Sequence, residues 1–127
     1  PSGLIVPVIQ DVDKKSLKQL TLELSQLSEK ARLGTLLPTE IQGGCFTISS
    51  LGGVGGTYFT PIINPPEVAI IGISKMKVEP IFSNKKFVAR KILPFSLSYD
   101  HRVIDGVTAV KFTRAFATIL EDLSILV

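Results

Sequence analysis

The sequence has few of the side chains that most readily do chemistry near neutral pH. Among its 127 residues are one cysteine, Cys45, one histidine, His101, and no tryptophan. A single cysteine excludes an internal disulfide and a thiolate metal cluster, and it fits a reducing cytoplasm. One histidine and one cysteine leave only carboxylates to complete a ligand set, so we expect no metal site. We expect Cys45 to be a small buried apolar residue.

Long apolar runs are also lacking. No uninterrupted stretch approaches the ~20 residues of a membrane span, and no basic segment followed by an apolar run suggests a signal peptide. Fourteen lysines and arginines against eleven acidic residues give a net charge of only +3, and the basic residues are scattered, so they form no footprint for nucleic acid. We therefore expect a cytoplasmic protein with no membrane partner and no nucleic-acid partner.

The 127 residues, 45% of them hydrophobic, fit one ordinary folded domain. The opening Pro1-Ser2-Gly3 has no initiator methionine and no capping device, which predicts that the chain begins inside a longer protein. Glycines at 52, 53, 55 and 56 form a loop that matches neither Gly-x-Gly-x-x-Gly nor a Walker sequence, so we interpret it as a backbone turn.

Apolar periodicity predicts a mixed α/β fold. One helix begins at the N-cap Ser16 and ends at Gly34, and a second begins at Asp105-Gly106. The first helix has an apolar stripe of Leu17, Leu20, Leu24, Leu27 and Ala31, opposite a charged face of Lys18, Glu23, Glu29 and Arg32. Strands are predicted at 4–9, 45–50, 68–75, 77–82, 87–93 and 95–99. This order indicates a mixed sheet with helices on one face.

His101 lies where the last strand meets the last helix, and two interpretations stand. It is either a structural histidine whose ring bonds fix this corner with Asp100 or Asp105, or a general base whose tautomer or pKa those carboxylates set. The end of a strand is a common ligand site in α/β sheets. Asp105 itself is either the N-cap of the last helix or a direct participant.

Ser49 and Ser50 end a predicted strand before the glycine loop. No Gly-x-Ser-x-Gly elbow surrounds them, so a nucleophilic serine is disfavoured. The two interpretations are a hydroxyl donor and a polar strand end.

Two segments together carry a recognisable pattern: Gly-Gly-Cys-Phe-Thr-Ile-Ser-Ser-Leu-Gly at 43–52 and Leu-Ser-Tyr-Asp-His-Arg-Val-Ile-Asp-Gly at 97–106. The chain resembles the catalytic domain of the dihydrolipoyl acyltransferases of 2-oxoacid dehydrogenase complexes. The Asp-His-Arg-x-x-Asp-Gly run is specific to them. The Thr-Ile-Ser-Ser form is more similar to the bacterial acetyltransferases of pyruvate complexes than to the succinyltransferases. The resemblance covers essentially all of 1–127, as the C-terminal part of that domain.

The resemblance implies transfer of an acetyl group from the thioester of a dihydrolipoyl arm to coenzyme A. His101 matches the family's base, which takes the proton of the coenzyme A thiol. Ser49 matches the hydroxyl donor to the oxyanion, and Asp105 matches an acid that holds the site's architecture. Coenzyme A is then a substrate, and the lipoyl group belongs to a separate domain outside this chain. The two motifs assign no residue to the coenzyme A phosphates.

The resemblance also implies a fold and partners. The fold is a two-layer, chloramphenicol acetyltransferase-like α/β structure, here incomplete at its N-terminus. Family members form trimers that assemble into a larger core, with each active site at a subunit interface, so the Ser49 that faces His101 comes from another subunit. The expected partners are the lipoyl domain and the dehydrogenase and dihydrolipoamide dehydrogenase components, in the bacterial cytoplasm. The alternatives are a branched-chain or other acyl group, a non-catalytic core component, and a thioester hydrolase.

Overall fold

The computed structural model describes residues 3–126, so the expectation drawn from Pro1 and Ser2 lies outside the described residues. The chain divides into two compact units. The described part of the first comprises 3–45 and 123–126, and the second is Phe46–Asp122.

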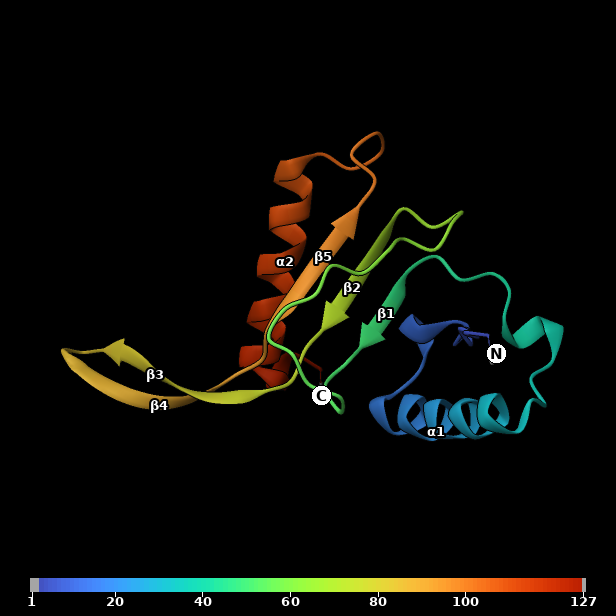
Figure 1. The fold of residues 1–127 in the computed structure, drawn as a ribbon, viewed down its shortest axis with the longest axis horizontal. Helices are drawn as coiled ribbons and strands as arrows, with labels where there is room; N and C mark the ends of the chain where they lie inside the picture. The colour runs from blue at the N-terminus through green and yellow to red at the C-terminus, as the bar shows by residue number, and fades with distance from the viewer. Residues whose placement is uncertain (1–2, 127) are drawn as a thin grey trace. The chain divides into compact units, whose positions relative to one another are not determined.

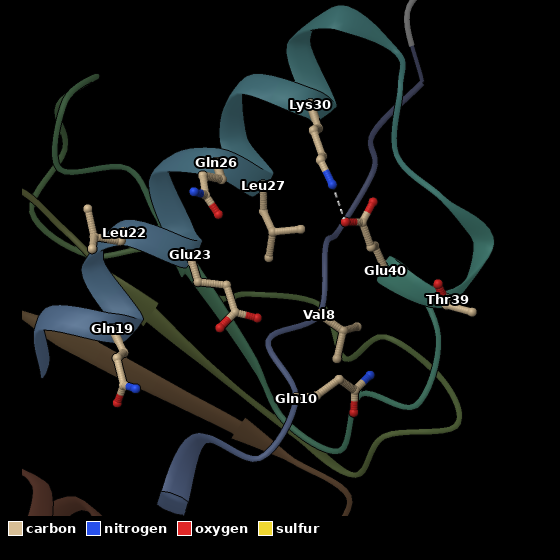
Figure 2. A pocket seen from close by; sticks show the side chains of 10 residues that line it. All are labelled: Val8, Gln10, Gln19, Leu22, Glu23, Gln26, Leu27, Lys30, Thr39 and Glu40. Carbon is tan, nitrogen blue, oxygen red and sulfur yellow. Dashed lines mark hydrogen bonds and ion pairs between the residues drawn. The ribbon is translucent and has the colours of Figure 1, made fainter. Parts of the chain in front are cut away.

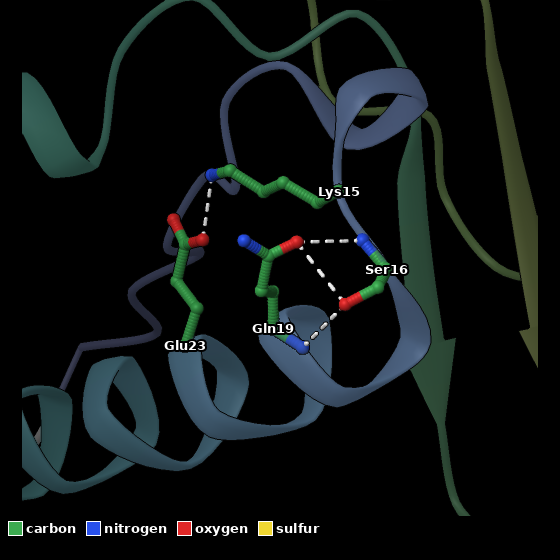
Figure 3. A network of polar contacts seen from close by, with 4 residues as sticks. All are labelled: Lys15, Ser16, Gln19 and Glu23. Carbon is green, nitrogen blue, oxygen red and sulfur yellow. Dashed lines mark hydrogen bonds and ion pairs between the residues drawn. The ribbon is translucent and has the colours of Figure 1, made fainter.

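The first unit is built around helix α1, Leu17–Leu33, which begins and ends as predicted. The Ser16 hydroxyl accepts a hydrogen bond from the Gln19 backbone N–H, and the Gln19 side-chain oxygen accepts one from the Ser16 N–H at 2.8 Å (Figure 3). Gly34 ends the helix at φ +70°, a conformation that glycine adopts without strain. Short 3-10 helices η1, η2 and η3 lie at Val12–Lys14, Pro38–Glu40 and Leu123–Leu126.

The predicted strand at 4–9 is absent from the structure, and this prediction was wrong. Its one backbone hydrogen bond to another segment runs from Val8 N–H to Glu40 O at 2.7 Å. Pro7 has no N–H to continue a ladder, so a single bond anchors an irregular, extended segment.

The predicted apolar stripe of α1 is also shifted. Leu27 is buried as expected, but Leu17 and Leu24 are 55% and 53% exposed. Glu23, expected on the charged outer face, is partly buried and forms an ion pair with Lys15 at 2.6 Å (Figure 3). Glu23 lies one turn before Leu27, so the covered side of the helix is centred on this pair, and the long Lys15 side chain neutralises the carboxylate.

The second unit contains a three-stranded sheet with the strand order β1-β2-β5. The strands are β1 Thr47–Ser50, β2 Ala69–Ile73 and β5 Phe95–Tyr99. Since β2 pairs with β1 in parallel and with β5 in antiparallel fashion, the sheet is mixed, as predicted. Ile71 at its centre is 1% exposed.

Helix α2, Gly106–Glu121, lies along one face of this sheet (Figure 1). The ring centroid of Phe116 lies 4.9 Å from that of Phe95 in β5, and Phe112 lies 5.5 Å from Phe46 just before β1. These aromatic contacts fix which face of the sheet the helix covers.

Strands β3, Lys77–Ser83, and β4, Lys86–Ile92, lie close to the strands predicted at 77–82 and 87–93. They pair as a hairpin and make a two-stranded sheet of their own (Figure 1). Asn84 and Lys85 connect them at φ 50° and 63°, the turn geometry that suits a hairpin. The expected single sheet is divided because the β2–β5 ladder ends at the bond from Ser74 N–H to Pro94 O, and Pro94 has no N–H to return.

Candidate functional site

His101 lies in the tight turn between β5 and α2. The carbonyl of Asp100 accepts hydrogen bonds from the backbone N–H groups of Val103 and Ile104, at 3.0 and 2.9 Å, which closes the turn. The imidazole is exposed, and its ring centroid lies 5.7 Å from that of Tyr99. Within residues 3–126 the imidazole makes no side-chain hydrogen bond, so the exposed ring is available to a substrate.

Asp100 does not hold the histidine. Its carboxylate is bound by Arg102, with Nη2 at 2.7 Å from Oδ2 and Nε at 3.0 Å from Oδ1. The backbone N–H of Arg102 donates to the same Oδ1 at 3.0 Å. These bonds lower the pKa of Asp100 to about 2, and the carboxylate in turn raises the pKa of Arg102. Asp100, one of the two carboxylates that the structural interpretation offered as partners of His101, instead forms a bidentate ion pair with Arg102.

Asp105 is the N-cap of α2. Its Oδ1 accepts the backbone N–H of Thr108 at 2.7 Å. The hydrogen bonds of Thr108 are the main cause of the lowered pKa of Asp105, with smaller contributions from the Val107 N–H and from the charge of His101. The capping interpretation of this residue is confirmed, and its side chain makes no hydrogen bond to His101 among the described residues.

Ser49 lies in β1 with its side chain half-buried, in register with Gly72 of β2, which is in register with Ser96 of β5. Residues in register point to one face of a sheet, and consecutive residues of a strand point to opposite faces. Phe95, the neighbour of Ser96, contacts Phe116 of α2. Ser49 therefore points to the face that α2 leaves uncovered.

Within one chain the sheet holds Ser49 away from His101. Tyr99 lies four positions after Phe95 in β5, so its side chain points to the α2 face. The His101 ring contacts the Tyr99 ring and therefore lies on the same side. Ser49 lies two strand spacings from Ser96 in β5, and Tyr99 lies three residues further along β5. From the usual spacings of a sheet, the Cα atoms of Ser49 and Tyr99 are therefore about 14 Å apart. The proposed base and the proposed hydroxyl donor thus lie on opposite faces.

The structure also tests two other sequence expectations. Val54 and Gly55 donate backbone N–H bonds to Leu51 O, so the glycine loop is a turn as interpreted. Cys45 is exposed, and the expectation that it is buried was wrong, because it lies in irregular chain ahead of β1. No helix in the described range is long and apolar enough to cross a membrane. Within residues 3–126 no three carboxylate, histidine or cysteine side chains gather to hold a metal ion.

The first unit has an open cavity of about 580 Å³ that the sequence patterns did not reveal (Figure 2). Seven of its ten lining residues are polar or charged; the ten are Val8, Gln10, Gln19, Leu22, Glu23, Gln26, Leu27, Lys30, Thr39 and Glu40. Lys30 Nζ lies 2.5 Å from the Glu40 carboxylate, whose pKa is lowered chiefly by the Leu37 N–H and then by Lys30. The charges of this cavity are neutralised in pairs, and it contains none of the three predicted site residues.

Comparison with known proteins supplies the family. The family model of the 2-oxoacid dehydrogenases acyltransferase catalytic domain matches residues 1–127. The chain is 56% identical over 122 residues to the dihydrolipoyllysine-residue acetyltransferase component of the pyruvate dehydrogenase complex of Cupriavidus necator, covering 96% of this chain and 22% of that protein.

Two solved structures are equally similar. One concerns the roles of a serine, a histidine and an asparagine in the catalytic mechanism of Azotobacter vinelandii dihydrolipoamide acetyltransferase, at 55% identity and a TM-score of 0.96. The other is the cubic core of the pyruvate dehydrogenase multienzyme complex, at 54% identity and a TM-score of 0.96. Each match covers 99% of this chain and 52% of the other, so the chain spans about half of those structures. The fold expected from the resemblance is confirmed, and the chain belongs to the family of 2-oxoacid dehydrogenase acyltransferase catalytic domains.

Proposed function

We propose that this chain supplies the catalytic groups for transfer of an acetyl group from a dihydrolipoyl thioester to coenzyme A in a pyruvate dehydrogenase complex. One observation carries the proposal. In the Azotobacter protein the named serine precedes the named histidine by 52 positions, and the asparagine follows the histidine by four. Here Ser49 precedes His101 by 52 positions and Asp105 follows it by four.

The exposed imidazole of His101 suits it as the base. A thiol with a pKa of about 8.5 is only a few per cent ionised at pH 7, and a positioned base contributes ~10²–10⁴-fold. His101 takes the thiol proton as the sulfur attacks the thioester carbonyl carbon. When the tetrahedral intermediate collapses, the carbon–sulfur bond to the dihydrolipoyl arm breaks, and that sulfur takes the proton back.

Ser49 suits the oxyanion that forms on the carbonyl oxygen. Its hydroxyl stands on a buried, hydrogen-bonded sheet, which holds the donor in place before the charge develops. The loss of one such donor typically costs ~10²–10³-fold in rate. The sheet therefore contributes by fixing the position of the Ser49 hydroxyl, which acts as a hydrogen-bond donor. Ser49 forms no covalent intermediate.

The opposite orientations of Ser49 and His101 support an active site shared between copies of the chain. The reaction needs a serine and a histidine that point into the same space, where the thiol meets the thioester carbonyl. One chain does not provide this arrangement, but two neighbouring copies can, with the serine from one and the histidine from the other. We infer trimers that assemble into a larger core, as in the cubic core of the similar complex. A lipoyl domain delivers the acyl group, and the dehydrogenase and dihydrolipoamide dehydrogenase components are the further partners.

Asp105 stands where the Azotobacter protein has an asparagine. Aspartate and asparagine side chains can both accept the N–H bond that caps a helix. This favours a positioning role for Asp105, in which the capped first turn of α2 orients the loop that carries His101. The bacterial relatives and the single cysteine support the bacterial cytoplasm as the location.

The test is acetyl transfer by the intact protein that contains this chain, with acetyl-dihydrolipoamide and coenzyme A. His101→Ala is expected to lower turnover by ~10²–10⁴-fold while the core still assembles. Wild-type assembly without turnover would identify a non-catalytic scaffold. Release of free acetate at a comparable rate without coenzyme A would identify a thioester hydrolase. Near-normal turnover of the variant would refute the role of His101.

A further inference from the structure

The carboxylate of Asp100, the residue before His101, is bound on both oxygens by one neighbouring side chain. Nε of Arg102 lies 3.0 Å from Oδ1 and 3.2 Å from Oδ2, and Nη2 lies 2.7 Å from Oδ2. The backbone N–H of Arg102 also donates to Oδ1, at 3.0 Å. A planar guanidinium presents its donors in a fork that a lysine ammonium cannot reproduce. Within residues 3–126, all hydrogen bonds to this carboxylate therefore come from Arg102.

His101 is the middle residue of the loop that these bonds close. The bond from the Arg102 N–H to the Asp100 side chain spans two residues and forms an Asx-turn around the histidine backbone. The Asp100 side chain is 22% exposed and that of Arg102 is 89% exposed, so the guanidinium covers the carboxylate on its solvent side. The pair fixes the backbone that carries the imidazole, and the pair has no net charge.

Other groups near the imidazole come from the two elements that the turn joins. Tyr99, at the end of β5, contacts the imidazole with ring centroids 5.7 Å apart. Asp105 begins α2, whose N-terminus adds a partial positive charge. The pKa of Asp105 is lowered mainly by its bonds with Thr108, and the charge of His101 adds to this. Asp105 is therefore a carboxylate that acts on the histidine.

The carboxylates on the side of β2 are paired with other groups. The carbonyl of Val68 accepts the backbone N–H of Asp100 at 2.8 Å, and the adjacent Glu67 carboxylate accepts a bond from the Thr47 hydroxyl. The pKa of Asp100 is lowered by Arg102 alone. Asp100 is thus next to the imidazole in the chain, but its charge is taken up by the guanidinium.

A general base has to be neutral before it takes a proton. An ordinary imidazole, with a pKa of about 6.5, is about three-quarters neutral at pH 7, and an unpaired carboxylate beside it favours the protonated form. We propose that Arg102 is a positioning residue that keeps His101 available as the base, by holding the Asp100 carboxylate in a neutral pair. Arg102 acts in this role through Asp100. The proposal rests on the function of His101 proposed above.

The experiment measures kcat/KM for coenzyme A between about pH 5 and pH 9, with the intact protein as wild type, Arg102→Gln and Asp100→Asn. This profile reports the essential acid and base of the free enzyme. Arg102→Gln leaves the carboxylate unpaired and is expected to move the acidic limb up by about half a pH unit. Asp100→Asn keeps an oxygen for the turn but leaves the guanidinium unpaired, so the limb is expected to move down by a similar amount. A merely structural role would lower the rate without moving the limb.

Three further variants are the controls. The double variant, Asp100→Asn with Arg102→Gln, removes both charges and is expected to return the limb to its wild-type position. Arg102→Lys keeps the charge without the fork and is expected to move the limb less than Arg102→Gln. Arg114→Gln removes the same charge from an exposed position of α2, about 13 Å along the helix from Asp105 and beyond the Debye length of about 10 Å at 0.1 M salt. It is expected to leave the limb in place.

Opposite shifts in the two single variants, cancelled in the double variant, would support the proposal. An unmoved limb in both single variants, a shift in the same direction in both, or an equal shift in Arg114→Gln would overturn it. Asp100→Asn carries the test by itself if Arg102→Gln does not fold. Near-normal turnover of His101→Ala would instead refute the proposed function, so the two failures are distinguishable.

Discussion

Ser49 and His101 point to opposite faces of one three-stranded sheet, Ser49 to the face that α2 leaves open and His101 to the side of Tyr99 and α2. A backbone ladder fixes the serine, and a closed turn fixes the histidine. Strand geometry places the Cα atoms of Ser49 and Tyr99, the ring neighbour of His101, about 14 Å apart. The chemistry proposed for the pair therefore requires a second copy of the chain.

Mixed cores test this requirement directly. If each site takes Ser49 from one copy and His101 from another, cores co-assembled from equal amounts of Ser49→Ala and His101→Ala chains should regain about a quarter of wild-type turnover, because one pairing in four has both residues intact. Each variant core alone is the control and should be inactive. If both groups came from the same chain, mixing would restore nothing.

Ser49 and Ser50 form a matched pair of adjacent hydroxyls on opposite faces of β1. Ser49→Ala should lower kcat by ~10²–10³-fold with little change in KM, since an oxyanion donor acts mainly in the transition state. Ser50→Ala removes the same atom from the other face and should leave kcat within about twofold. Equal losses in both variants would show that the hydroxyls support the strand and not the oxyanion.

Asp105→Asn should keep both stability and turnover near wild type, because an amide oxygen can accept the Thr108 N–H bond. Asp105→Ala removes the cap and should destabilise the protein by about 1 kcal/mol. Thermal unfolding and acetyl-transfer rates of the two variants check this. A large loss of turnover in the asparagine variant, without loss of stability, would assign the carboxylate charge a direct part in the reaction.

The ion pair of Asp100 and Arg102 predicts that part of the protein's folding stability is lost at acidic pH. The pKa of Asp100 is lowered from 3.8 to about 2 in the folded protein, so its contribution to stability is complete above about pH 4 and is lost as the pH falls toward 2. Asp100→Asn lacks this titration. The stability difference between wild type and this variant, measured by unfolding, should therefore shrink between about pH 4 and pH 2, and a constant difference would contradict the assignment.

Local patterns predicted the elements whose signals are local. The N-cap Ser16, the terminal Gly34 and the Asn84-Lys85 turn each satisfy nearby backbone groups or backbone conformations, and these boundaries lie where the sequence placed them within a few residues. The mixed sheet also followed from the order of the strands.

Features that depend on which partner a side chain contacts in the folded chain were missed. The sequence did not show that Glu23 is neutralised by Lys15, or that Arg102 removes Asp100 from His101. A Cβ atom added to Gly72 in β2 would lie 2.8 Å from Cζ of Phe59, and this close approach joins positions 13 apart. A lone glycine in an apolar strand signals that something lies near, but the identity of the neighbour depends on how the intervening chain folds back. The site residues themselves came from a motif and not from periodicity.

The contact between Phe59 and Gly72 also sets an order in which the two positions can change. A side chain at 72 clashes while the phenyl ring is present, whereas a smaller residue at 59 vacates the space that such a side chain needs. The two substitutions are therefore strongly non-additive. A lineage, or an engineer, that widens this part of the molecule has to begin at 59, and position 72 becomes free to vary only afterwards.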